Sequence, residues 1–226
     1  MKTSKTLTAA VTLALAAMSP LTAQAADTIL LNEGFDDITN LPGWILVNYS
    51  TPVGQNWFQG NSGVFSAQSG GPDSYIGANF LSASALGGYL DNWLITPELN
   101  LGASTKLSFY TRTEAAMGKN DTLEVRFSSG AGTDITGFST LLTTVGGANA
   151  YPCNWQQFTA STMAGGTGRF AFRYVGDAGV ANFIGIDTVS ITAVPEPATY
   201  LMLGLGLAAL TVRRRMASLS TRFLKG

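Results

Sequence analysis

The sequence predicts an all-β fold, an antiparallel β-sandwich with jelly-roll connectivity. Several stretches alternate apolar and polar residues with the period of two that is typical of strands. Clusters of turn-forming residues separate these stretches, and no long helical period occurs between the two terminal segments. The 26 glycines and the low charged fraction of 12% suit short strands joined by many turns.

Two stretches show the alternation most clearly. Leu123, Val125 and Phe127 share one face of residues 122–128, and the aromatic residues of 169–175 share a face opposite two arginines. Turn-formers at 118–121, 130–134 and 165–168 lie between the alternating stretches. The expected strands, in chain order, are residues 44–48, 89–96, 106–110, 122–128, 155–160, 169–175 and 181–191.

The last expected strand contains an irregularity. Ile184 and Ile186 have one parity, whereas Val189 and Ile191 have the other, so the phase slips at Asp187-Thr188. A β-bulge produces such a slip and can turn an acidic side chain or a free carbonyl towards the rim of a sheet. The alternative is a strand that is buried on both faces.

The first 25 residues have the features of a secretory signal peptide. Lys2 and Lys5 form a basic start, an apolar run follows in residues 7–18, and Ala23 to Ala25 supplies a small-x-small cleavage pattern. An N-terminal membrane anchor is the alternative, but the run is short for a membrane span. We expect cleavage after residue 25, which leaves residues 26–192 as the folded domain.

The C-terminal segment has the features of a sorting and anchoring signal. Pro195-Glu196-Pro197 precedes a glycine-interrupted apolar stretch, which ends at Arg213, Arg214 and Arg215. The apolar stretch of about fifteen residues is near the short limit for crossing a bilayer. The arginines would hold its C-terminal end in the cytoplasm. We therefore expect residues 193–216 to form a short transmembrane tether and residues 217–226 a short tail.

This order of motif, hydrophobic helix and arginine cluster resembles the PEP-CTERM sorting signal of Gram-negative bacteria. The resemblance implies processing near Pro195-Glu196-Pro197 by an exosortase, often in organisms that make extracellular polysaccharide. Residues 216–226 depart from the pattern, because such proteins commonly stop soon after the arginines. An ordinary C-terminal anchor is the alternative.

The central region carries a series of short motifs in a fixed order: residues 33–37, 41–44, 91–97, 107–110, 169–174 and 184–189. In this order they resemble the choice-of-anchor J family, which is related to the cleaved-adhesin and MAM-type jelly rolls. Members of that family occur with different surface anchors, and a PEP-CTERM tail is one of them. The two resemblances are therefore consistent with each other.

The missing residue types exclude several kinds of chemistry. The chain has no histidine, which rules out a Ser-His-Asp triad, a histidine zinc site and a histidine general base. The single cysteine, Cys153, cannot form an intramolecular disulfide, and we expect a plain buried or loop thiol. The net charge of −1 offers no basic face for nucleic acid.

The family resemblance also implies a structural Ca²⁺ between the first acidic loop and the last strand. Ca²⁺ takes six to eight oxygen ligands from carboxylates, amides and backbone carbonyls. In the alternative, the acidic side chains are solvated or accept hydrogen bonds from backbone amides. A bound ion would hold the first and last strands together. The positions that match are Glu33, Asp36 and Asp187, with Asp91 and Asn92 as additional donors.

Aromatic residues suggest a carbohydrate site. Trp57 lies in a stretch rich in Gly, Asn and Ser, so we expect an exposed ring that could stack against a glycan. The alternative is a core position, which we expect for the three other tryptophans. Two carboxylates could serve a glycosidase, but fourteen acidic residues supply such a pair in any fold. Other aromatic residues near this stretch are Tyr49, Phe65, Tyr75 and Tyr89.

These observations predict an exported, non-catalytic protein of the cell surface or extracellular matrix in a Gram-negative bacterium. Its expected role is adhesive or structural, in a biofilm or exopolysaccharide. Its expected partners are an exosortase-like processing enzyme, the inner membrane and a polysaccharide, but no nucleic acid. The alternatives are a carbohydrate-binding module and a glycoside hydrolase.

Overall fold

The computed structural model describes residues 27–85 and 87–194, together with five helical residues near the C-terminus (204, 206, 207, 210 and 211). The described residues between 27 and 194 cluster as one compact unit. No helix among the described residues is long and apolar enough to cross a membrane. The predicted signal peptide (1–25) and the sorting residues Pro195, Glu196, Pro197, Arg213, Arg214 and Arg215 lie outside the described residues.

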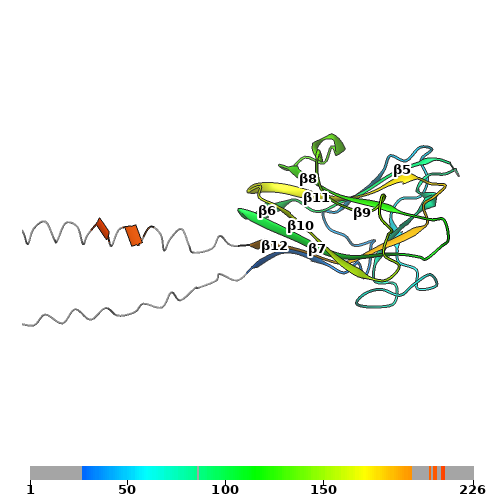
Figure 1. Cartoon of the computed structure of the whole chain (residues 1–226), viewed down its shortest axis with the longest axis horizontal. Coiled ribbons are helices and arrows are strands. Elements are labelled where there is room, and N and C mark those ends of the chain that lie inside the picture. Colours follow the sequence, from blue (N-terminus) through cyan, green and yellow to red (C-terminus); the bar gives the residue numbers. More distant parts are fainter. Residues whose placement is uncertain (1–26, 86, 195–203, 205, 208–209, 212–226) are drawn as a thin grey trace, which may run out of the picture. The chain divides into compact units, whose positions relative to one another are not determined.

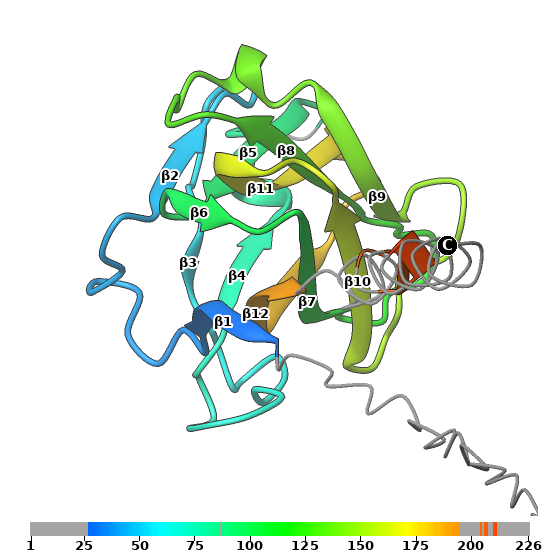
Figure 2. The ribbon, with the colours of Figure 1, turned by 90° about the vertical axis from the view of Figure 1, so that its left-hand side faces the viewer.

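Two antiparallel sheets pack face to face and confirm the predicted β-sandwich (Figures 1 and 2). In sheet A, the strand order is β10-β7-β12-β4-β3, and β1 also pairs with β12. Its strands are β1 (Thr28–Glu33), β3 (Phe58–Gln59), β4 (Ile76–Asn79), β7 (Ser104–Thr113), β10 (Gln156–Thr162) and β12 (Phe183–Val194).

In sheet B, the order is β2-β5-β11-β8-β9, and β6 also pairs with β11. Figure 2 shows β5, β8 and β11 of this sheet in one layer and β4, β7 and β12 of sheet A in the other. Two short 3-10 helices, η1 (Phe80–Ser82) and η2 (Ile135–Gly137), lie in the connections. The strands are β2 (Ile45–Asn48), β5 (Tyr89–Ile95), β6 (Leu99–Leu101), β8 (Thr122–Ser129), β9 (Thr140–Gly146) and β11 (Gly166–Asp177).

The main core lies between the two sheets and contains the apolar faces that the alternation predicts. Leu123, Val125, Phe170 and Phe172 are completely buried in it. Phe109 of β7 meets Phe172 of β11 edge to face, with ring centroids 5.0 Å apart. Such pairs stabilise beyond the area that they bury, so this contact links the two sheets directly.

All seven expected strands form, but five others (β1, β3, β4, β6 and β9) were not predicted. The turn expected at residues 165–168 is wrong in part, because Gly166–Gly168 pair with β6 and begin β11. The predicted bulge is confirmed: the β12–β7 register shifts between Asp187 and Ser190, and Thr188 has a φ of +50°. Left-handed backbone at a β-branched residue is unusual and is compatible with a bulge.

The contact between Phe109 and Phe172 generates a stability prediction. We expect Phe172→Ala to lower the free energy of unfolding by about 3–5 kcal/mol, because it removes a buried ring and leaves a cavity. Urea unfolding followed by circular dichroism measures the change. Met163→Ala is the matched control, since Met163 is 87% exposed and should change stability little. Equal stabilities for the two variants would contradict this account of the core.

Candidate functional site

Asp187 lies at the bulge of β12 and is fully buried. Its Oδ2 accepts hydrogen bonds from the backbone N–H groups of Gln68 (2.8 Å) and Ser69 (3.1 Å), and its Oδ1 accepts from Thr188 N–H (2.5 Å). Burial raises the pKa of Asp187 above its ordinary value, and these hydrogen bonds oppose that shift. Within the described part of the chain, no basic side chain forms an ion pair with it.

The segment that Asp187 holds is the loop of residues 60–74, which covers part of the outer face of sheet A. Tyr75 ties down its start: the hydroxyl donates to Asn61 O (2.9 Å) and accepts from Asn61 N–H (2.8 Å). Phe65 stacks on Tyr75 with ring centroids 5.0 Å apart, and the Arg112 guanidinium lies 4.3 Å from the centre of the Phe65 ring. This loop is therefore anchored by both polar and aromatic contacts.

The first acidic loop reaches the same region. Strand β1 pairs with β12 so that Glu33 is opposite Val189, close to the bulge, and Glu33 Oε1 accepts from Phe35 N–H (2.8 Å). A Cβ placed on Gly70 would be 2.9 Å from Asp36 Oδ1, so Asp36 borders the loop segment that Asp187 binds. No three acidic, histidine or cysteine side chains among the described residues gather closely enough to hold a metal by themselves.

The structure does not bring Asp91 and Asn92 to this group, because both belong to β5 of sheet B. Asp91 lies on the outer face of that sheet. Asn92 points inward and is fully buried; its Nδ2 donates to Ser82 Oγ at 2.9 Å, and its Oδ1 has no partner among the described residues. Their separation from the acidic loop follows from the layering of the sandwich.

The prediction that Trp57 presents an exposed ring to a glycan is wrong. Its side chain is 4% exposed and packs in the main core. The reason is strand pairing: β3 pairs with β4, and this places Phe58 on the outer face of sheet A and Trp57 on the inner one. Trp44 and Trp93 are buried as expected, whereas Trp155 is only partly buried.

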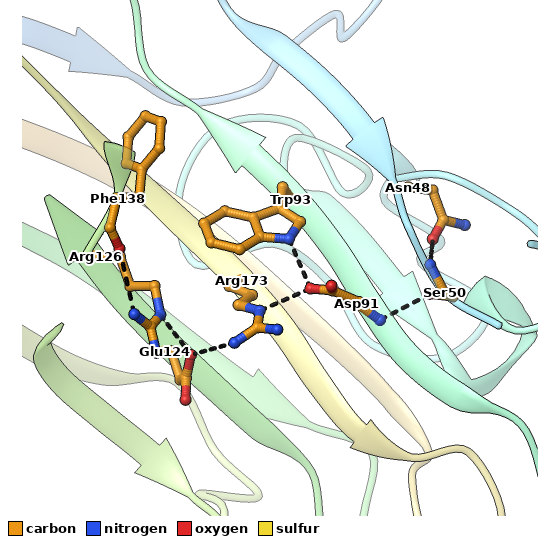
Figure 3. Close-up of polar contacts among 8 residues, drawn as sticks. All are labelled: Asn48, Ser50, Asp91, Trp93, Glu124, Arg126, Phe138 and Arg173. Carbon is orange, nitrogen blue, oxygen red and sulfur yellow. Dashed lines mark hydrogen bonds and ion pairs between the residues drawn. The ribbon is translucent and has the colours of Figure 1, made fainter. Parts of the chain in front are cut away.

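A row of charged side chains crosses the outer face of sheet B (Figure 3). Arg173 of β11 donates from Nε to Asp91 Oδ1 (2.7 Å) and from Nη1 to Glu124 Oε2 (3.2 Å). Arg126 of β8 donates from Nε to the same Glu124 oxygen (2.7 Å). Trp93 Nε1 donates to Asp91 Oδ1 (2.6 Å), and the Arg173 guanidinium lies 5.0 Å from the centre of the Trp93 ring. We call these four charged residues the charged row.

The charged row borders a small pocket of about 250 Å³. Apolar contacts hold the loop with η2 over one end of the sheet, where Phe138 packs against Trp93, and the carbonyl of Phe138 accepts from Arg126 Nη1 (3.2 Å). The sequence did not reveal this site, although the outward parity of Glu124, Arg126 and Arg173 was visible in it. The lining residues are Trp93, Arg126, Ile135, Thr136, Phe138, Ser139 and Arg173.

A larger hollow of about 560 Å³ lies at one end of the sandwich, lined in part by Tyr151 and Cys153. Cys153 is exposed in the loop before β10, in agreement with the expectation of a loop thiol. Behind the hollow, the buried carboxylate of Asp121 accepts from Thr113 Oγ1 (2.6 Å) and from Asn182 N–H (2.8 Å). Asp121 also accepts from the hydroxyl of Tyr174 in β11, so its contacts join the two sheets and have a structural role.

Two family models match the chain. Residues 28–191 match the Cleaved Adhesin Domain, and residues 193–215 match the PEP-CTERM protein-sorting motif. No curated protein sequence matches it. The first match runs from the start of β1 to Ile191 of β12, and the second begins at Ala193, next to the last residue of β12.

Solved structures with the same fold include domains of Lys-gingipain from Porphyromonas gingivalis W83. The K1 cleaved adhesin domain is 27% identical with a TM-score of 0.56, and the match covers 72% of this chain and 97% of that domain. The K3 domain is 24% identical with a TM-score of 0.53, covering 74% and 99%. A family 61 carbohydrate-binding module in complex with β-1,4-galactotriose is 15% identical with a TM-score of 0.45, covering 74% of this chain and 98% of that module.

The anchoring of residues 60–74 generates a prediction about alkaline pH. Burial raises the pKa of Tyr75 to about 12. The folded protein therefore keeps this proton between pH about 10, where an unfolded tyrosine loses it, and pH about 12. The stability that Tyr75 contributes is present below pH about 10 and is lost as pH rises through this interval.

Near-ultraviolet absorbance titration and alkaline melting curves measure the effect. We expect Tyr75→Phe to remove one late-titrating phenol and to weaken the decline in stability over this interval. Tyr89→Phe is the matched control, because Tyr89 is 55% exposed. If Tyr75→Phe left the titration unchanged while Tyr89→Phe removed the late step, the assignment would be wrong.

Proposed function

The chain belongs to the Cleaved Adhesin Domain family, and on this basis we propose that it is an exported, non-catalytic adhesive or structural protein of the cell surface or extracellular matrix. The observation that supports the proposal most strongly is the order of the two matches. A complete adhesin-type sandwich is followed, after a single residue, by a PEP-CTERM sorting motif. A sorting motif implies recognition by an exosortase-type processing enzyme.

The proposal includes the steps of delivery. A signal peptide in residues 1–25 directs export through the inner membrane of a Gram-negative bacterium, and residues 193–216 form a transient transmembrane tether. The sandwich, with jelly-roll connectivity, folds outside that membrane. Its extensive core supports this order of events, because a domain without an intramolecular disulfide must depend on packing in an oxidising compartment.

Processing of the full-length chain tests this proposal. The chain is produced in a Gram-negative host that has an exosortase and in an otherwise identical strain without it. We expect a shorter, surface-exposed form only in the first strain, and we expect alanine at Pro195, Glu196 and Pro197 to prevent its formation. Intact mass and protease accessibility of whole cells report the outcome. The same mass and the same location in both strains would refute processing of this kind.

We also propose that one structural Ca²⁺ binds where the first acidic loop meets the bulge of β12. Asp36 and Asp187 border the same segment, 68–70, and Glu33 precedes the loop. The fully buried Asp187 carboxylate supports a nearby cation, because an unpaired buried charge is costly. The side chains are too few to complete the coordination, so backbone carbonyls or water must supply further oxygens. Asp91 and Asn92 are not part of this proposal.

Melting of residues 26–197 with Ca²⁺ and with a chelator tests the ion. At a Ca²⁺ concentration about 100 times the Kd, binding adds about 2.7 kcal/mol, which corresponds to roughly 5–10 °C in Tm for a domain of this size. We expect Asp187→Asn to abolish this shift. Asp27→Asn, which removes an exposed carboxylate, is the matched control and should keep it. No shift and no calcium by elemental analysis would remove the ion from the proposal.

A further inference from the structure

The two outer faces of the sandwich differ in how far they are covered. On sheet A, the loop of residues 60–74 packs its aromatic side chains against the strands. On sheet B, the loop with η2 covers only the end at which Trp93, Ile95 and Ala171 lie. Ile45 and Val47 of β2 pack at this covered end, whereas the opposite end of the face, from Asp91 to Tyr89 of β5, lies outside the cluster.

Two tyrosines lie on this open part. Tyr89 precedes Leu90, whose side chain points inward, so the Tyr89 side chain points outward. Tyr49 is opposite Asp91, because the N–H of Tyr49 donates to Asp91 O (2.8 Å). The pairing of β2 with β5 continues in the same register to the bridge between Thr51 and Tyr89. Both rings therefore stand on the outer face, and they are 50% and 55% exposed for Tyr49 and Tyr89. Diagonal neighbours of this kind are about 7–8 Å apart, so the two rings form one aromatic surface beside Asp91.

The charged row next to this surface has unused hydrogen-bonding capacity. Asp91 Oδ2, Glu124 Oε1 and the Nη2 groups of Arg126 and Arg173 have no partner among the described residues. None of these atoms belongs to the buried atoms that lack a partner, so they reach solvent. The face thus presents two acceptors and two donors whose side chains are held in place by their other bonds.

The charge balance indicates which ligand this face suits. The charges of the two guanidinium groups and the two carboxylates sum to zero, and ion pairs join these groups across β5, β11 and β8. An ionic ligand would have to compete with these pairs, whereas a hydroxyl group can accept from a free Nη2 and donate to a free carboxylate oxygen at once. Preformed side chains also reduce the entropy that binding costs.

We propose that the outer face of sheet B binds a neutral polysaccharide, with sugar rings stacked on Tyr49 and Tyr89 and their hydroxyl groups bonded to the charged row. The proposal rests on the proposed function and names the partner of the adhesive protein. The pocket of about 250 Å³ at the covered end would take at most one sugar unit, since pockets for drug-sized ligands measure ~300–1,000 Å³. The chain of sugars therefore lies along the open part of the face.

Affinity electrophoresis of residues 26–197 tests the proposal. The gels contain either a neutral polysaccharide (xylan, galactan, galactomannan or a mixed-linkage glucan) or an acidic one (polygalacturonate or alginate). We expect at least one neutral polysaccharide to retard the protein. The double variant Tyr49→Ala/Tyr89→Ala should weaken that binding at least tenfold, and Tyr49→Phe/Tyr89→Phe should retain it because the rings remain.

Met163→Ala is the matched control, since Met163 is an exposed apolar residue just before β11, whereas Tyr89 pairs with Asp177 at the other end of that strand. Circular dichroism verifies that every variant is folded. Three outcomes would overturn the proposal. The neutral polysaccharides do not retard the protein, only the acidic ones do, or wild type and the double alanine variant are retarded equally. These outcomes leave the processing experiment on the full chain unaffected, so failure of the glycan site can be distinguished from failure of the proposed function.

Discussion

The register shift in β12 is the constraint on which the rest of sheet A depends. On one edge, β12 pairs with β4 before the shift, at residues 183–186, and with β1 after it, at residues 189–193. The shift lets Ile184 and Ile186, and then Val189 and Ile191, point into the same core despite their opposite parities. Asp187 occupies the junction and binds the loop of residues 60–74, so one irregularity determines where two strands meet and how a loop is held.

The same physical chemistry has opposite consequences on the two outer faces. On sheet A, a polar group is withdrawn from water completely, and backbone amides satisfy the buried Asp187. On sheet B, the charged residues neutralise one another but keep part of their hydrogen-bonding capacity directed to solvent. A covered face contributes to stability, whereas a half-exposed, preorganised one is available for a ligand. This difference gives the sandwich one side that is suited to recognition.

Because the chain has a single cysteine and no intramolecular disulfide, its stability depends on packing between the sheets. Phe109 and Phe172 meet across the two sheets, and Phe127 and Phe170 pair within sheet B with ring centroids 5.3 Å apart. The buried Asp121 adds hydrogen bonds to Thr113 in one sheet and to Tyr174 in the other. None of these contacts involves the C-terminal sorting residues, so they can form before or after the tail is processed.

The sequence alone determined the features that depend on neighbours along the chain. Alternation identified β8, β11 and the apolar faces, the parity change located the bulge, and the terminal patterns identified the sorting motif later matched at residues 193–215. Only the tertiary structure decided which strands adjoin. It buried Trp57, placed Asp91 and Asn92 on the opposite sheet from Asp187, and joined Arg173 to Asp91 and Glu124 across 82 and 49 positions of the chain. The reason is that side-chain parity is local, whereas the register between distant strands is set by packing of the whole core.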